Sequence, residues 1–109
     1  MIAQQKMKAF ELQAEVAKAV AHPLRIAVLD YLRDGEQCVC DIAEYVGAER
    51  SNISRHLAVM VNAGVLSYRK DGLKVIYRLR TPCVMEFFAS MSKCLKQRID
   101  EEKRALRAV

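Results

Sequence analysis

Two short helical patterns joined at a glycine occupy residues 38–64, which read CVCDIAEYVGAERSNISRHLAVMVNAG. Apolar residues recur at helical spacing over 39–46, and Gly47 then supplies a stop that suits a tight turn. The same spacing returns over 53–61, and Gly64 ends that second pattern. Two short helices joined by a glycine turn predict a helix-turn-helix.

The flanking segments extend this unit in both directions. Apolar and polar residues alternate over 66–68 and 75–79 on either side of Asp71-Gly72, which predicts a two-stranded hairpin. Helical periodicity covers 7–20 and 24–32 ahead of the helix-turn-helix. Helical periodicity returns after the hairpin, where the pair Thr81-Pro82 predicts the cap and first turn of a last helix.

The predicted fold is mainly α with a small β wing, in the order ααααββα, and forms one winged helix-turn-helix domain over residues 1–109. The last helix carries a stripe that is too apolar to face water, formed by Val84, Phe87, Phe88, Met91, Leu95 and Ile99. We therefore predict a two-fold homodimer that pairs through its first and last helices.

Composition places the chain among globular proteins of one core. It has 109 residues, of which 52% are hydrophobic and 28% are charged. No apolar run approaches the roughly 20 residues of a membrane span, and the first 21 residues lack a signal-peptide core. We expect a cytoplasmic protein with no membrane partner.

Positive charge is concentrated in one part of the chain. The formal net charge is +5, and residues 50–80 hold seven basic residues against one acidic residue, so this segment alone carries +6. Such a block is typical of a surface that contacts nucleic acid, although a charge run taken alone also fits a solvated face.

The second helix of the helix-turn-helix and the hairpin hold the candidate DNA-binding residues. Asn52 and Arg55 are the residue types that make bidentate contacts to adenine and guanine edges in the major groove. The remaining candidates for phosphate or base contacts are Arg50, Ser51, Ser54 and His56 on the helix, and Arg69, Lys70 and Lys74 in the wing. The alternative is that Ser51 caps the helix and that its neighbours lie on an ordinary solvated face. The predicted partner is double-stranded operator DNA.

The four cysteines are expected to be reduced thiols in the cytoplasm. Cys38, Cys40 and Asp41 place two thiolates and a carboxylate within four residues, a set that suits As(III), Cd(II), Pb(II) or Zn(II). Residues two apart on a regular helix point about 200° away from each other, so one ion can reach both sulfurs only if the helix unwinds locally. Such a distortion would shift the adjacent DNA-reading helix.

Cys83 and Cys94 form a second candidate pair on the last helix. They are 11 residues apart, which corresponds to roughly 16 Å along a helix, so one chain cannot close a site between them. Antiparallel last helices in a dimer would bring Cys83 of one chain towards Cys94 of the other. The alternative for each cysteine is a small buried hydrophobe.

Other function classes fit the residues less well. A thiol-redox sensor of the same fold would oxidise its cysteines to a disulfide and need no metal. A thiol oxidoreductase is disfavoured because the motif is Cys-x-Cys and no strand-helix-strand pattern surrounds it. A protein-interaction module that has lost DNA binding is disfavoured by Arg50, Arg55 and the wing charges. We predict no enzymatic activity.

The chain resembles the ArsR/SmtB family of metal-sensing repressors over about residues 20–99, and four stretches carry the resemblance. They are Ala21-His22-Pro23-Leu24-Arg25, Cys38-Val39-Cys40-Asp41-Ile42-Ala43, Ser54-Arg55-His56-Leu57 and Val75-Ile76-Tyr77-Arg78-Leu79. The resemblance implies a dimeric winged-helix repressor that leaves its operator when metal binds. Family members often control efflux or detoxification genes.

The resemblance also implies roles for the cysteines. Cys38 and Cys40 fall on the cysteine pair of arsenite-type members, and Asp41 matches an oxygen ligand of zinc-type members. Ala43 departs from the best-known arsenite pattern, which has a third cysteine there, and no cysteine precedes Cys38 to replace it.

On the last helix, Cys83 and Cys94 fall on the two histidine positions of the intersubunit site of zinc-type members. The acidic positions of that site fall on Thr81 and Gln97. Arsenite is the inducer that the resemblance favours, with Cd, Pb or Zn as alternatives.

Overall fold

The computed structural model describes all residues from Met1 to Val109. Five helices and three strands follow one another along the chain: α1 (Gln4–Val20), α2 (Pro23–Leu32), β1 (Gln37–Cys38), α3 (Val39–Val46), α4 (Arg50–Asn62), β2 (Leu66–Asp71), β3 (Lys74–Leu79) and α5 (Val84–Arg107). The predicted helix-turn-helix is α3 and α4, and the predicted hairpin is β2 and β3. The winged arrangement is therefore confirmed.

The start of α2 and the turn after α3 follow directly from local chemistry. Pro23 begins α2, and Nδ1 of His22 accepts a hydrogen bond of 3.1 Å from the backbone N–H of Leu24. Gly47 ends α3 with φ 70° and ψ 37°, the left-handed conformation that costs glycine little. The chain leaves α3 at this turn, and α4 begins at Arg50.

Two local predictions were wrong. The sheet has a third strand, because Gln37 and Cys38 form β1 and pair antiparallel with Tyr77 and Ile76 of β3. Two residues are too few to show alternation in the sequence, so this strand gives no local signal. Thr81 does not cap α5: its hydroxyl donates a 2.8 Å hydrogen bond to the carbonyl oxygen of Gly64, and Cys83 occupies the N-cap position.

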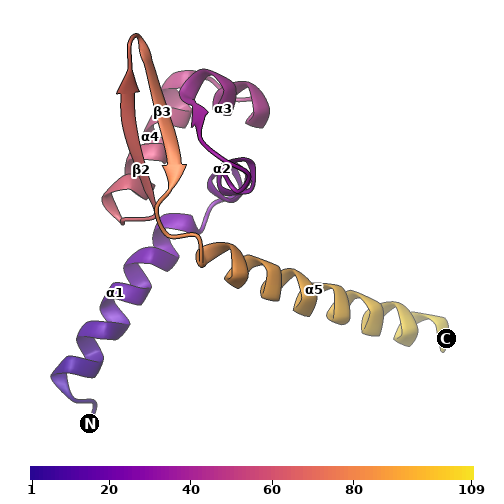
Figure 1. The fold of residues 1–109 in the computed structure, drawn as a ribbon. Coiled ribbons are helices and arrows are strands. Elements are labelled where there is room, and N and C mark those ends of the chain that lie inside the picture. Colours follow the sequence, from indigo (N-terminus) through magenta and orange to yellow (C-terminus); the bar gives the residue numbers. More distant parts are fainter.

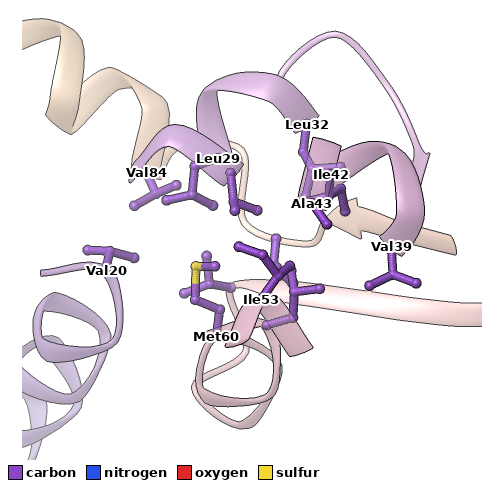
Figure 2. Close-up of a cluster of buried hydrophobic side chains, with 13 residues drawn as sticks. Val20, Leu29, Leu32, Val39, Ile42, Ala43, Ile53, Met60 and Val84 are labelled. Carbon is purple, nitrogen blue, oxygen red and sulfur yellow. The ribbon is translucent and has the colours of Figure 1, made fainter. Parts of the chain in front are cut away.

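One hydrophobic core joins all five helices and the first residue of the wing. Figure 2 shows Val20 of α1, Leu29 of α2, Ile42 of α3, Ile53 of α4 and Val84 of α5 turned towards a common centre. Four of the apolar positions on α3 and α4 are buried as their spacing indicates, since Ile42, Ile53, Leu57 and Met60 are all fully buried. Each such side chain stabilises the fold by about 1.5–3 kcal/mol relative to an exposed one.

The first and last helices leave this body as two arms. Figure 1 shows α1 and α5 diverging from the region where α2, α4 and the wing meet, with the chain termini far apart. Large apolar side chains lie exposed along both arms, including Phe10 and Leu12 on α1 and Phe87, Met91 and Leu95 on α5. A packed single chain would cover such stripes, so the arms present surfaces suited to a partner. None of the helices combines the length and the apolar composition that crossing a bilayer requires.

Candidate nucleic-acid interface and cysteine sites

Helix α4 presents the predicted polar face. Ile53, Leu57 and Met60 fix its buried side, which leaves Arg50, Ser51, Ser54 and Arg55 exposed and Asn52 half-buried. Glu49, not Ser51, stands at the N-cap position, and no side chain caps the helix. The hydroxyl of Ser51 therefore does not serve as the helix cap and stays free for an external partner.

Asn52 and Arg55 form a pair on this face. Nη2 of Arg55 donates a 3.4 Å hydrogen bond to Oδ1 of Asn52, one turn earlier on the exposed side of α4. The contact holds both polar groups in a common orientation before any ligand binds. No carboxylate lies within 4.0 Å of the Arg55 guanidinium, so its charge is uncompensated within the chain.

His56 differs from the other candidates on α4. It is half-buried, its ring lies 4.4 Å from that of His22, and its Nδ1 accepts a 3.0 Å hydrogen bond from Nε of Arg25. Burial, followed by the charges of His22, Arg25 and Arg55, lowers the pKa of His56 below its ordinary value. Nδ1 of His56 is therefore engaged within the chain and joins α4 to α2, which leaves Nε2 for the predicted contact of His56 with DNA.

The wing residues divide into two kinds. Lys70 and Lys74 are exposed near the tip of the hairpin, and no carboxylate lies within 4.0 Å of either ammonium group. Arg69, in contrast, pairs with Oε2 of Glu36 at 3.0 Å and with Oδ2 of Asp71 at 3.7 Å. The charge of Arg69 is thus already paired in the free chain, and its contact with the DNA backbone stays a prediction, as do those of Lys70 and Lys74.

The first cysteine pair spans a strand and a helix. Cys38 is half-buried in β1, paired with Ile76 of β3, while Cys40 is exposed on the first turn of α3 beside the exposed Asp41. The expectation that Cys38 and Cys40 share a regular helix is therefore wrong, because Cys38 has extended backbone angles of φ −78° and ψ 156°. Motion of Cys38 would act on the wing as well as on α3.

Tyrosines border this pair. Tyr31 of α2 stacks on Tyr45 of α3 with ring centroids 4.2 Å apart and an interplanar angle of 12°. Burial, then the charges of Asp41 and Cys38, raise the pKa of Tyr31. The charges of Asp41 and Cys38 therefore act on the hydroxyl of Tyr31, an influence that sequence spacing did not indicate.

The second cysteine pair lies on α5. Cys83 and Cys94 are both exposed, and Cys83 borders an apolar groove of about 710 Å³ between α1 and the start of α5. No group of three or more His, Cys, Asp or Glu side chains lies close enough together to hold a metal ion within one chain. The predicted ligands at either pair thus require local movement or a second copy of the chain to complete a metal site.

An exposed basic recognition helix beside a β wing defines the class: a winged helix-turn-helix DNA-binding regulator. Residues 22–68 match the sequence model of the bacterial regulatory proteins of the arsR family. The HTH-type transcriptional regulator Rv0081 of Mycobacterium tuberculosis is 38% identical over 87 residues, which cover 79% of this chain and 76% of that protein. The chain belongs to the ArsR/SmtB family.

A solved structure and a second relative extend the comparison. The solution structure of the homodimeric winged helix-turn-helix domain of Mb0332 from Mycobacterium bovis, a possible ArsR-family regulator, superposes with a TM-score of 0.79 at 26% identity. That match covers 92% of this chain and 93% of the other. The CadC homolog of Staphylococcus aureus, a cadmium resistance regulatory protein, is 37% identical over 67 residues, or 61% of this chain and 55% of that protein.

Proposed function

We propose that this chain is a transcriptional repressor that binds operator DNA as a two-fold dimer and leaves it when a thiophilic ion binds its cysteines. The observation that carries the proposal is the uncompensated positive charge of Arg50, Arg55, Lys70 and Lys74 on α4 and the wing, none of which has a carboxylate within 4.0 Å. DNA phosphates supply the missing negative charge.

The proposed dimer uses the apolar arms. Phe87 and Met91 of α5 and Phe10 and Leu12 of α1 are 40–56% exposed, which is unfavourable for isolated helices in water. A two-fold pairing of these helices would bury them and set the spacing between two α4 helices, which must match successive turns of the major groove. The homodimeric state of the Mb0332 domain supports a dimer of this chain.

In the proposed complex, Asn52 and Arg55 read base edges, and Arg50, Ser51, Ser54, Lys70 and Lys74 hold the backbone. All of these side chains except the half-buried Asn52 are exposed. Residues 1–109 act as one domain, and we expect it to work in the cytoplasm.

The proposed inducer is arsenite, with Cd(II), Pb(II) and Zn(II) as alternatives. Cys38, Cys40 and Asp41 are the ligands at the first site, because soft thiolates select such ions. Drawing Cys38 and Cys40 onto one ion would change the backbone where β1 meets α3, and this change would lower the population of the DNA-competent geometry. Cys83 and Cys94 are the ligands of a second site shared between two chains.

A redox sensor is the second candidate, because three of the four cysteines are exposed and none is paired. Two thiols and one peroxide molecule would give a disulfide and two waters. The CadC homolog, a cadmium resistance protein, favours the metal mechanism over this one.

The experiment starts from a fluorescein-labelled DNA site selected from a random-sequence library by the reduced protein. As(III), Cd(II), Pb(II) and Zn(II) are then titrated separately into the complex while anisotropy is followed, with peroxide in a parallel sample. Release by one or more ions supports a metal sensor and ranks its inducers. Release by peroxide alone favours the redox sensor, and failure to select any DNA site contradicts the proposed function as a whole.

A further inference from the structure

A polar cleft of about 420 Å³ lies between the start of α2 and the flank of α4, and it joins three predicted DNA-contact residues of α4 to two residues, His22 and Arg25, that the sequence did not single out for DNA contact. Its polar lining consists of His22 and Arg25 from α2 and its cap, and Asn52, Arg55 and His56 from α4. No carboxylate lines the cleft. The site therefore carries two permanent positive charges and no negative one.

Arg25 is held in this cleft by neutral partners only. Its Nε donates to Nδ1 of His56 at 3.0 Å, and its Nη1 donates to the carbonyl oxygen of Ala19 at 3.3 Å. A guanidinium has five N–H donors, so three remain free. A half-buried cation without a carboxylate within 4.0 Å is costly unless an anion approaches it.

The two imidazoles offer donors as well. Nδ1 of His56 accepts from Arg25, and Nδ1 of His22 accepts from the backbone N–H of Leu24. In each neutral ring the proton consequently sits on Nε2, which is a donor. The remaining side-chain acceptor on the lining, Oδ1 of Asn52, is used as well, because it accepts from Arg55. The cleft thus combines free donors with positive charge, which is the chemistry that binds a phosphate oxygen.

We propose that this cleft holds a phosphate group of the operator backbone, with Arg25 as its main contact; the inference rests on the DNA binding proposed above. Asn52 and Arg55 line the cleft and also stand on the face of α4 proposed to enter the major groove. Backbone phosphates border that groove, so a base-reading position of α4 brings a phosphodiester to the mouth of the cleft. A free oxyanion such as inorganic phosphate has the same chemistry, but docking of α4 in the major groove does not bring it to the cleft.

The salt dependence of operator affinity distinguishes a phosphate of the DNA backbone from a free phosphate ion. Operator affinity is measured from about 50 to 200 mM salt for the wild type, Arg25→Gln, Arg25→Lys and the control Arg33→Gln, since each phosphate contact contributes about 0.9 to the slope of log K against log salt. Arg33 is matched to Arg25 because it is also an arginine of the α2 region, but it is exposed and pairs with Asp30 and Asp34.

We expect Arg25→Gln to lower the slope by about one, Arg25→Lys to keep it, and Arg33→Gln to leave it unchanged. Operator and scrambled DNA should weaken by the same factor in Arg25→Gln. Equal loss of slope in Arg25→Gln and Arg25→Lys would overturn the proposal, because it would trace the effect to the lost His56 contact. An unchanged slope in both variants would also overturn it.

A second experiment tests the binding of inorganic phosphate. The ring protons of His22 and His56 are followed by NMR while phosphate is added to the DNA-free protein. Shifts at millimolar phosphate that vanish in Arg25→Gln, combined with an unchanged DNA salt slope, would assign the cleft to a free oxyanion and overturn the backbone assignment. Loss of DNA binding by the wild type itself would instead contradict the proposed function.

Discussion

Nδ1 of His56 accepts a 3.0 Å hydrogen bond from Nε of Arg25, a residue 31 positions earlier in the chain, and this bond joins α4 to α2. The bond needs an unprotonated Nδ1. Burial is the main reason why the pKa of His56 is lowered, and the charges of His22, Arg25 and Arg55 lower it further. Protonation of Nδ1 would also remove the acceptor of this bond.

Stability should consequently depend on pH through His56. Because the folded pKa lies below the unfolded value of about 6.5, the contribution of the neutral ring is complete above that pH and is lost as the pH falls through the folded pKa. Urea unfolding between about pH 8 and pH 5 should show a larger loss of unfolding free energy for the wild type than for His56→Gln. Parallel pH curves for the two proteins would contradict this prediction.

Arg55→Ala should weaken operator binding by about 1–3 kcal/mol, the usual cost of losing a bidentate base contact. The variant should also discriminate less between the operator and a site changed at one base pair. Anisotropy titrations measure both quantities, and Arg33→Ala, at the α2 C-cap and paired with Asp30, is the control. An unchanged affinity for the operator would dismiss Arg55 as a base contact.

The wing arginine and lysines should differ in their effect on salt dependence. Lys70→Ala should lower the slope of log K against log salt by about one, because its ammonium group has no partner within the chain. Arg69→Ala should lower the slope by less than half as much, since Glu36 and Asp71 already compensate its charge. The reverse order would mean that DNA binding breaks both ion pairs of Arg69.

The double variant Cys38→Ser with Cys40→Ser should keep the wild-type affinity for DNA but fail to dissociate when the inducing ion is added. The substitution removes both soft ligands while it changes no charged group of α4 or the wing. Cys83→Ser with Cys94→Ser is the matched control in the same anisotropy assay. Full ion-induced release in the first variant, and none in the second, would move the sensing site to α5.

Gly47→Ala should lower the free energy of unfolding by about 1–2 kcal/mol. Gly47 has φ 70°, and a Cβ built there meets no atom within 4 Å, so the cost comes from the backbone conformation and not from a clash. Gly47→Asn should cost less, because asparagine tolerates the left-handed region. Urea unfolding of the three proteins measures the difference, and equal losses for alanine and asparagine would contradict the explanation.

Local periodicity and turn residues in the sequence predict much of the fold. The spacing of Ile53, Leu57 and Met60 predicts the buried side of α4, and Asp71-Gly72 predicts the hairpin that the structure contains. Both signals arise from neighbours in the chain. The strand β1 cannot be predicted from neighbours in the chain, because its two residues become a strand only by pairing with β3.

The candidate sites also depend partly on local sequence and partly on tertiary contacts. The sequence by itself determined which residue types are available: the basic block, the cysteine pairs and the polar face of α4. Only the tertiary structure decided which charges are free, since Glu36 and Arg69 are 33 positions apart and Arg25 and His56 are 31 apart. Hydrogen bonds and ion pairs depend on distances of about 3 Å between side chains, and packing of the whole chain, not spacing along it, sets those distances.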